Sequence, residues 1–523
     1  MKRDTAGLGQ GLAVRKGTAT MEKEDLLDAR VRQDLAFIQY LYTHNGHATR
    51  KQMALDLQVD PRLIADHMAI LGDQLNSLFP DAPFHLGPPD AEYILDLINL
   101  PTLEDVTNLL IRDGSAYQIL VYIFWHNDFT MTSLQRELLM SSSTLFRHVG
   151  RLNELLAQFH LAIRNNRLQG REVDIRHFYF LLFSVVNDRD ERLTNTNNPQ
   201  IEQFITDLQN SVTGPLPMDT RQSVRIYLHL LLQRVAVNQP LNDDTGGFRL
   251  ATIKELPGMA AMFAIWGRLF TRNNHINPEF EGVAFFVFAF YAHVFPLDSE
   301  LYHTLFLLTN PFSSRLRSYV HAVMDLLSSK FDLGGQQREL QLIFFTELTT
   351  MALLPGAITN AHQLVYTAMQ GIYWKPESGQ MQFIHMIISR LQRLSPAFSA
   401  PGAEDMLVER LTMTVLLLLV HTRRQFRIGL VTTTDLATNY YMRRGISQQV
   451  SANFNVSVSN YDSTEQYDII VTTSVEMSNH IGLKNDLPLI QMQDFGTGSD
   501  FVLLYWYLDA LVSNYLKTDL PDP

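Results

Sequence analysis

Cysteine is absent from all 523 residues of the chain. Its absence excludes disulfide bonds, zinc–thiolate sites, cysteine nucleophiles and phosphocysteine carriers. Apolar runs are also short: the longest, residues 283–297, is broken by His293 and cannot span a bilayer. The N-terminus lacks the apolar core of a signal peptide, and we expect residues 1–25 to form a disordered tail. These absences predict a soluble, cytoplasmic protein, whose natural start is either Met1 or Met21.

Sequence signatures of catalysis are missing as well. The chain contains no GxxxxGK(S/T) phosphate loop, no recognisable nucleophile–base pair and no clustered metal ligands, and Gly445 and Gly482 stand alone. We therefore predict that the protein is not an enzyme, that it has no catalytic residues and no metal site, and that it requires no cofactor.

The charge balance limits how the chain can meet a polyanion. The net charge is −12, and 46% of the residues are hydrophobic. That hydrophobic content is ample for buried cores, and the length predicts three to five domains. An acidic balance argues against polyanion binding over the whole surface. Any contact with nucleic acid is therefore confined to local basic patches.

Three helical patterns follow one another within residues 116–182. Apolar side chains recur at helical spacing around Ile119, then around Leu134, and then from Leu145 onward. A run of hydroxyl residues at 141–144 separates the second pattern from the third. Its side chains can cap the third helix, so the segment predicts two helices joined to a third by a short polar turn.

A short hairpin pattern comes after the third helix. Residues 159–163 alternate like a strand, Asn165 and Asn166 supply a tight turn, and Gly170 closes a second strand. Three helices followed by a β-hairpin make a winged helix-turn-helix. The segment therefore predicts contact with DNA.

The outer face of the third helix carries hydroxyl and basic side chains. Such groups can enter a major groove and contact base edges and phosphates. Between residues 129 and 180, seven arginines outweigh four acidic residues and give a local net charge of +3. An arginine-bearing helical hairpin with a solvated face is the alternative, but it does not account for the order of turn, cap, helix and wing. We predict DNA contacts from Ser142, Ser143, Thr144, Arg147, His148 and Arg151 on the helix, from Arg164 and Arg167 at the wing tip, and from Arg171 beyond it.

Two short motifs connect this segment with a known family. The chain carries LNELL at residues 152–156 and GREVDIRHF at residues 170–178. With the serine-rich turn before the third helix, the segment resembles the central DNA-binding domain of the Mga/AtxA-like transcription regulators of bacteria. The resemblance covers about seventy residues, roughly one small domain. It implies a transcription regulator, as an activator of global, virulence or carbohydrate-linked genes.

An earlier segment predicts another helix-turn-helix. Residues 33–42 are helical, Thr49 caps a second helix, and Pro61 occupies the first position of a third. Five basic residues between positions 29 and 80 are balanced by five aspartates, so electrostatic support for DNA binding is absent. The segment is either an auxiliary DNA contact or a helical dimerisation and packing module. As a DNA contact it would use Arg50, Lys51, Arg62 and His67.

The middle of the chain, residues 195–421, is helical and divides into two blocks of roughly 110 residues, which suits paired five-helix domains. This order resembles the Mga/AtxA-like layout, in which two phosphotransferase-regulation domains (PRDs) follow the DNA-binding region. The resemblance implies that histidines in these domains are phosphorylated by the sugar phosphotransferase system, whose phosphocarrier protein is a transient partner. A phosphoryl group adds nearly two negative charges and can reorganise a helix interface.

His229 and His321 are the candidate phosphorylation sites. Arg225 lies one turn before His229 and Arg234 lies nearby, and both can pair with a phosphate. Arg317 lies one turn before His321. The alternative for both histidines is an ordinary core position with a satisfied hydrogen bond. Possible substitutes are His293, His385 and His421.

The last hundred residues alternate between strand and helix patterns, which predicts an α/β domain with a parallel sheet. The domain resembles the IIB subunit of the phosphotransferase system. Active IIB proteins carry a phosphate-accepting cysteine after the first strand, so the resemblance implies a lost phosphocarrier reaction. The corresponding loop offers Thr432, Asp435 and the two threonines between them. Two roles remain for the domain: its loop binds an anion, or the domain serves as a dimerisation platform. The predicted elements are strands at 427–432, 454–458, 468–472 and 488–490, a helix up to 449, and a closing helix at 500–516.

The closing helix carries more large apolar side chains than one small sheet face can cover. Exposed apolar and aromatic patches mark partner surfaces. We therefore predict a homodimer with residues 427–523 as a main contact; the alternative is that the helix only seals its own domain. The side chains concerned are Phe501, Leu503, Leu504, Trp506, Tyr507, Leu511 and Tyr515.

The predicted fold class is mostly α and multidomain, with two N-terminal winged helix-turn-helix domains, two helical PRD-like bundles and a C-terminal α/β IIB-like domain. The predicted function is a transcriptional regulator that binds double-stranded promoter DNA, is tuned by histidine phosphorylation and dimerisation, and has no membrane partner. The alternatives are a PRD-containing RNA-binding antiterminator and a phosphotransferase-derived interaction scaffold without DNA binding. The predicted boundaries are 1–25 for the tail, 26–100 and 101–190 for the helix-turn-helix domains, 191–305 and 306–421 for the PRD-like domains, and 424–523 for the IIB-like domain.

Overall fold

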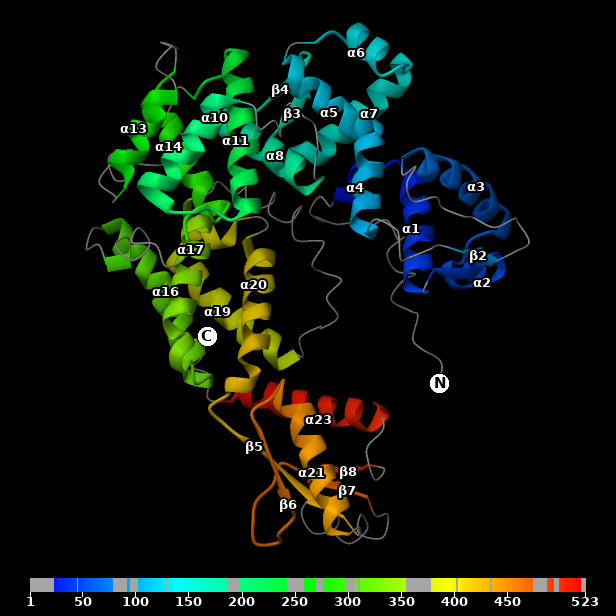
Figure 1. Cartoon of the computed structure of the whole chain (residues 1–523), viewed down its shortest axis with the longest axis vertical. Helices are drawn as coiled ribbons and strands as arrows, with labels where there is room; N and C mark the ends of the chain where they lie inside the picture. The colour runs from blue at the N-terminus through cyan, green and yellow to red at the C-terminus, as the bar shows by residue number, and fades with distance from the viewer. Residues whose placement is uncertain are drawn as a thin grey trace. The chain divides into compact units, whose positions relative to one another are not determined.

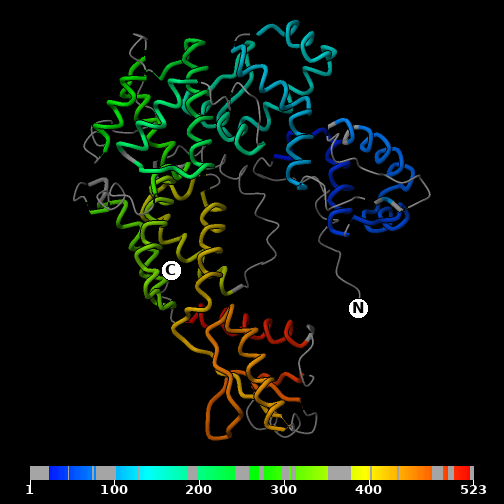
Figure 2. Tube along the Cα trace, viewed as in Figure 1, coloured from blue at the N-terminus to red at the C-terminus, as the bar shows by residue number. Residues whose placement is uncertain are grey.

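The computed structural model is mostly helical, with a small parallel sheet near the C-terminus (Figure 1, Figure 2). It divides into two compact units, residues 1–294 with 357–371 and residues 295–356 with 372–523. In the described part of the chain, every helix is too short or too polar to cross a membrane. The described residues are 23–44, 46–78, 92–94, 102–127, 129–186, 193, 198–241, 258–269, 276–296, 306–307, 311–353, 378–400, 403–432, 435–473, 487–492 and 498–518.

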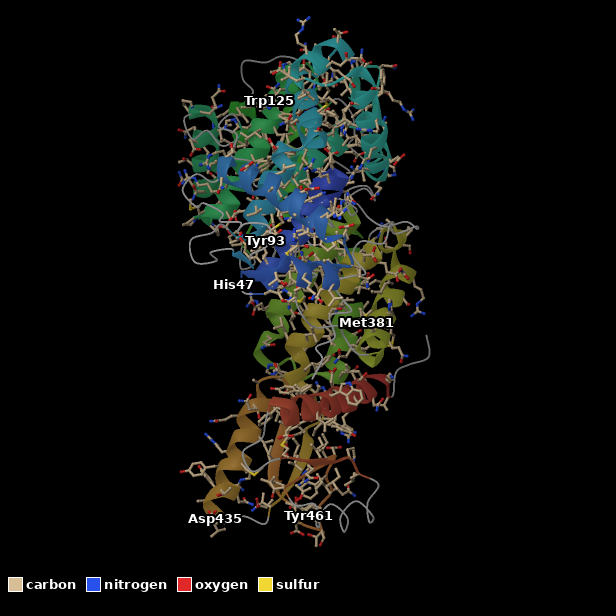
Figure 3. All side chains as sticks on the ribbon, turned by 90° about the vertical axis from the view of Figure 1, so that its right-hand side faces the viewer. His47, Tyr93, Trp125, Met381, Asp435 and Tyr461 are labelled. Carbon is tan, nitrogen blue, oxygen red and sulfur yellow. The ribbon has the colours of Figure 1, made fainter. Side chains whose placement is uncertain are left out.

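The first unit begins with three described α-helices and two short paired strands, in the segment predicted to be the first winged helix. The Thr49 hydroxyl accepts a hydrogen bond from the Gln52 N–H at 3.2 Å, so the predicted cap of the second helix is confirmed. Two short strands pair antiparallel with Ala48 opposite Tyr93, which Figure 3 labels. The helices predicted at residues 33–42 and from Pro61 are also confirmed. In chain order the elements are the 3-10 helix η2 (Lys23–Leu26), α1 (Ala29–Thr43), β1 (His47–Thr49), α2 (Arg50–Leu57), α3 (Pro61–Leu78) and β2 (Glu92–Ile94).

A second winged helix follows, with the predicted order of helices and hairpin. A further helix, α8, packs back on it: the Tyr179 hydroxyl donates to the Leu120 carbonyl at 3.0 Å, and the ring centroids of Tyr179 and Phe124 lie 4.7 Å apart. The three helices predicted within residues 116–182 correspond to α5, α6 and α7. The elements are α4 (Leu103–Asp113), α5 (Ser115–His126), α6 (Met131–Glu137), α7 (Ser142–Leu156), the 3-10 helix η3 (Ala157–Phe159), β3 (Ala162–Arg164), β4 (Arg167–Gln169) and α8 (Glu172–Val185).

A helical bundle completes the described part of the first unit. Two of its helices begin at an Asn-Pro pair, in which the asparagine side chain accepts backbone N–H groups and the proline occupies the first helical position. Aromatic rings fill its core, where Trp266 and Phe285 lie 5.2 Å apart and Tyr227 stacks on Phe288 at 4.0 Å. The elements are α10 (Pro199–Leu208), the π-helical turn η4 (Gln209–Thr213), α11 (Met218–Ala236), α13 (Met259–Leu269) and α14 (Pro278–Tyr291).

Among its described residues, the second unit opens with four long helices. Tyr319 and Phe398 meet edge to face with their ring centroids 4.9 Å apart, and both side chains are buried. The helices pack α16 on α17 and on α19, and α19 on α20. The elements are α16 (Pro311–Lys330), the 3-10 helix η5 (Gly334–Gln336), α17 (Gln337–Leu353), α19 (Ser378–Leu394), the 3-10 helix η7 (Pro396–Ser399), α20 (Ala403–Leu418) and the 3-10 helix η8 (Leu419–His421).

A four-stranded parallel sheet follows, as the alternating pattern predicted. Its strand order is β6-β5-β7-β8. Asp435 caps the helix after the first strand, and Figure 3 shows it and Tyr461 at the carboxyl-end side of the sheet. The predicted threonine loop lies partly outside the described residues, because positions 433–434 do. The elements are β5 (Phe426–Val431), α21 (Leu436–Ser451), β6 (Val456–Asn460), β7 (Ile469–Thr472), β8 (Leu489–Gln491) and α23 (Gly498–Lys517).

The closing helix α23 is bonded to the helices before the sheet. The Ser513 hydroxyl accepts from the Gly379 N–H at 2.8 Å, and Gln380 donates to the Asp509 carboxylate at 2.6 Å. A Cβ at position 379 would overlap Ser513, so glycine permits this close approach of α19. One face of α23 is therefore buried against α19, while Val502, Leu503 and Trp506 remain exposed.

Candidate nucleic-acid interface

The turn between α6 and α7 places the third helix of the second winged domain. The Ser141 hydroxyl accepts the Thr144 N–H at 3.2 Å and so caps α7. Leu139 adopts a positive φ of 51° in the turn. Leu145 and Leu152 of α7 and Leu134 of α6 are fully buried, so they fix which face of α7 points outward. The predicted capping run and inward leucines are confirmed.

Exposed side chains form a stripe along the first half of α7. Ser142, Ser143, Phe146 and Arg147 are exposed, as is Gly150 one turn later, and Thr144 is half-buried beside the cap. Spacings of three to five residues place these positions on one side of the helix. Sequence reasoning missed Phe146 and Gly150, although their i+4 spacing from Ser142 and Phe146 was readable in the pattern.

His148 does not lie on this stripe, which corrects its predicted outward placement. Its side chain is only 8% exposed, and its Nδ1 atom lies 3.8 Å from the Asp28 carboxylate. The reason is geometric: His148 is four residues before the buried Leu152 and three after Leu145, so it shares their inward face.

Arg151 is engaged by a segment far away in the sequence. Its guanidinium donates to the carbonyl oxygens of Asp25 and Leu27 at 2.6 and 2.9 Å, and it lies 3.9 Å from the Asp28 carboxylate. Side-chain contacts of this kind hold the start of α1 against α7. Arg151 is therefore held by main-chain carbonyls while about a third of its side chain stays exposed, and its contact with DNA stays a prediction.

The same segment corrects part of the expected N-terminal tail. Lys23 is buried, and its ammonium group donates to Glu104 at 3.0 Å and to Asn108 at 3.2 Å on α4. A buried ammonium group is stable only when such partners pair with it. These contacts therefore hold residues 23–25 against α4, as part of the fold. Residues 1–22 lie outside the described part of the chain.

The wing is a two-residue hairpin, as predicted. Asn165 and Asn166 both have positive φ, 51° and 60°, which is the turn geometry that matches strand twist. The Asn153 side chain, part of the LNELL motif, accepts from the Ile163 N–H at 2.6 Å and donates to its carbonyl at 3.2 Å. It thereby fixes the wing against α7. Both predicted wing arginines, Arg164 and Arg167, are exposed.

Two arginines beyond the wing have structural partners. Arg171, predicted to suit DNA backbone contacts, forms two hydrogen bonds with the Asp174 carboxylate at 2.7 and 2.9 Å. Arg176 is buried, and its guanidinium meets the Glu281 carboxylate at 2.5 and 3.1 Å. The local excess of positive charge counted from the sequence therefore overstates what faces solvent.

Arg176 belongs to a buried ionic network that joins α8 to the bundle. Its Nε also donates to Glu172 at 2.8 Å, and Arg234 of α11 donates to the same carboxylate at 2.7 and 2.9 Å. Burial lowers the pKa of the Arg176 guanidinium, but the carboxylates of Glu281 and Glu172 outweigh it and raise that pKa overall. The group therefore stays charged, and it links α8 of the second winged domain to α11 and α14.

The first winged helix presents a weaker set of basic groups. Lys51 and Arg62 are exposed and Arg50 is half-buried. His67 is buried, with its Nδ1 atom 2.5 Å from Asp34, so its predicted reach toward DNA is corrected. Burial raises the pKa of the Asp34 carboxyl against the opposing effect of His67. The pair holds α1 against α3.

The candidate phosphorylation sites differ in accessibility. His229 is half-buried on α11, and His321 is exposed on α16. The arginines predicted to receive a phosphate at His229 have carboxylate partners already: Arg225 donates to Glu202 at 2.8 Å, and Arg234 is bonded to Glu172. Each arginine would have to exchange its carboxylate partner for a phosphate, so their pairing with a phosphate stays a prediction.

Comparison with known proteins identifies the second winged domain. The family model described as the Mga helix-turn-helix domain matches residues 101–183. Residues 101–183, the Mga domain, are therefore similar to the helix-turn-helix domain of that family. The match covers α4 to α8 almost to its end, so it includes the capped turn, the exposed stripe of α7 and the wing.

A curated relative supports the same assignment. The chain is 22% identical over 284 residues to a protein of Streptococcus pneumoniae serotype 4 described as "Putative trans-acting regulator". The alignment covers 53% of this chain and 56% of that protein, so the chain spans about half the length of the curated relative it matches. Together with the match to the Mga domain, this likeness supports a Mga-like regulator family.

Proposed function

We propose that the protein is a transcriptional regulator that binds duplex DNA through its Mga helix-turn-helix domain. The exposed face of α7 is the observation that carries this proposal. Ser142, Ser143 and Arg147 occupy the N-terminal half of the helix, which is the part of a recognition helix that reaches base edges. Arg164 and Arg167 at the wing tip are placed to contact phosphates, which position a protein on DNA without reading sequence.

A gel shift with duplex DNA and with single-stranded RNA tests this proposal against its alternatives. Binding to duplex DNA that weakens as salt rises is the expected result, because arginine contacts release counterions from phosphates. Preference for RNA would instead favour an antiterminator. Binding to neither nucleic acid would favour an interaction scaffold.

We propose in addition that the two helical blocks are PRD-like and that the phosphotransferase system regulates the protein through them. Exposure of His321 supports access by a phosphocarrier protein. At His229 a phosphoryl group would have to compete with Glu202 for Arg225. Because α11 also holds Glu172 through Arg234, such a change would act on the network that anchors the Mga domain.

If His229 and His321 are the phosphorylated residues, their replacement should reduce phosphate labelling of the protein. After incubation with the general phosphotransferase components, the wild type is expected to give a shifted band on a phosphate-trapping gel. His229→Ala and His321→Ala should each remove part of that band, and the double variant should remove most of it. His47→Ala, in the first winged helix, is the control and should label normally. Full labelling of the double variant would assign the role to other histidines.

We further propose that the α/β domain is IIB-like and mediates homodimerisation through α23. Val502, Leu503 and Trp506 are exposed on this helix, with Trp506 64% exposed. Large apolar side chains gathered on one surface are typical of partner contacts. A dimer would present two Mga domains to neighbouring DNA half-sites and raise affinity through effective concentration.

The dimer proposal predicts that Trp506→Glu shifts the full-length chain from dimer toward monomer by at least roughly tenfold in dissociation constant, because it buries a charge at the interface. Light scattering over a concentration series measures this. Tyr441→Glu is the matched control, since Tyr441 is exposed to a similar extent (63%) on α21. A wild type that is monomeric at micromolar concentration would refute dimerisation. Dissociation by the control alone would move the interface to α21.

A further inference from the structure

Phe146 is a large apolar side chain on the exposed stripe of α7, and 59% of its surface is open to solvent. The leucines of the same helix at 145, 152 and 156 are buried. A single exposed apolar residue is ordinary on a protein surface and carries no meaning by itself. The position of Phe146 is what distinguishes it.

The neighbours of Phe146 are the groups that would face a major groove. Ser142 lies one turn before it and Gly150 one turn after it, and Ser143 and Arg147 flank that line on the next positions. A Cβ built on Gly150 meets nothing within 4 Å, so the helix surface beyond Phe146 is open. The ring thus stands between hydroxyl groups and a guanidinium, all in the first two and a half turns of α7.

The chemistry of the groove limits what such a ring can contact. Hydroxyl and guanidinium groups match the hydrogen-bonding edges of bases and the phosphates. Within the major groove, the apolar group that distinguishes one base from the others is the 5-methyl group of thymine. An apolar side chain on the reading face gains from meeting that methyl group, because both leave water together.

We propose that Phe146 contacts a thymine 5-methyl group in the major groove and so sets base specificity. The site it reads carries thymine next to the base pair contacted by Arg147, whose guanidinium suits a guanine edge. This inference rests on the proposed function, since it requires that α7 enters duplex DNA. It adds a specificity-determining residue and the base that this residue selects.

Replacement of thymine by deoxyuridine tests the contact without disturbing the rest of the site, since it removes only the methyl group and keeps the base pair. A duplex is first enriched from a randomised pool with the full-length protein. Each thymine is then replaced singly, and affinity is measured by fluorescence anisotropy. For the wild type we expect one position at which the replacement weakens binding roughly fourfold, the equivalent of one buried methyl group.

The variants assign that effect to one side chain. Phe146→Ala should bind the thymine and deoxyuridine duplexes equally, whereas Phe146→Leu should retain discrimination because it keeps an apolar contact. Leu139→Ala, in the turn before α7, is the matched control: Leu139 is 92% exposed, and its loss should leave discrimination unchanged. Both positions are exposed, so the thermal melting of all three variants should match that of the wild type.

The outcomes separate this inference from the proposed function. Enrichment of a duplex, followed by equal thymine–deoxyuridine discrimination in the wild type and Phe146→Ala, overturns the role of Phe146 while DNA binding stands. Absence of any such discrimination in the wild type overturns it as well. Failure to enrich any duplex overturns the proposed function, and this inference with it. A change of oligomeric state in Phe146→Ala, without a change in discrimination, would place Phe146 in a protein contact instead.

Discussion

Glu281→Ala is expected to destabilise the contact between α8 and α14 by about 3–5 kcal/mol, the usual cost of removing one partner of a buried ion pair. Glu281 is fully buried and accepts two hydrogen bonds from Arg176, at 2.5 and 3.1 Å, and one from the Leu241 N–H at 3.0 Å. Its removal leaves Arg176 with Glu172 and the Gln239 carbonyl as partners. Hydrogen exchange of α8, α11 and α14 should rise accordingly.

A surface pair in the same unit provides the control for Glu281. Arg268 is 58% exposed and pairs with Asp207 at 2.8 Å, so Arg268→Ala should change the local unfolding free energy by less than about 1 kcal/mol. Equal exchange in Glu281→Ala and Arg268→Ala would contradict the role assigned to the buried network. Loss of DNA binding in Glu281→Ala alone would indicate that this network positions the Mga domain.

Arg147→Ala is expected to weaken duplex DNA binding by about 1–3 kcal/mol, the usual value of an arginine that contacts a base edge. Arg147 is exposed in the first half of α7 on the same stripe as Ser143. Because it lies on the surface, its removal should leave the melting temperature unchanged. Anisotropy with an enriched duplex measures the effect, and a melting curve of each variant excludes unfolding.

Arg151→Ala tests whether Arg151 contacts DNA directly or instead supports the position of α7 through contacts inside the protein. Its guanidinium is bonded to the Asp25 and Leu27 carbonyls, so the expected primary effect is faster hydrogen exchange in residues 23–28. Any loss of DNA affinity should be smaller than for Arg147→Ala. Unchanged affinity in the Arg147→Ala variant, or a larger loss in the Arg151→Ala variant, would contradict this division of roles.

Local signals in the sequence predicted much of the Mga domain. Ser141 caps α7 and Asn165-Asn166 makes the hairpin turn because these residue types satisfy a helix end and adopt positive φ over a few neighbouring positions. Leu134 and Leu145 are buried for the same kind of reason, since helical spacing places them on one face. Interactions confined to a few residues are readable from a single chain.

Contacts between distant segments were not predictable in the same way. Arg151 meets carbonyls more than a hundred positions earlier, and Arg176 meets Glu281 more than a hundred positions later. The residues next to each arginine in the sequence suggest an exposed cation. Its hydrogen-bond partner becomes apparent only in the folded structure. The net charge counted from the sequence therefore overestimated the exposed basic surface of the domain. Phe146 was missed because apolar residues at helical spacing usually line the buried face of a helix, whereas Phe146 lies on the exposed face.

The C-terminal domain shows both situations. Alternating patterns located the parallel sheet, since buried strands and intervening helices have distinct periods. The sequence also showed that α23 carries an excess of large apolar side chains. It did not show which of these side chains are buried and which are exposed. Leu504 is buried, Ser513 and Asp509 bind the start of α19, and Trp506 remains exposed. The outcome depends on the neighbouring helix, which the pattern of α23 does not encode.

Selection of duplexes from a randomised DNA pool by the full-length protein tests the central claim most directly. The exposed stripe of α7 predicts that the wild type enriches a defined sequence motif and that Arg147→Ala loses this enrichment while remaining folded. Enrichment of no motif by the wild type, or of the same motif to the same extent by Arg147→Ala, would contradict the assignment of α7 as the DNA-reading helix.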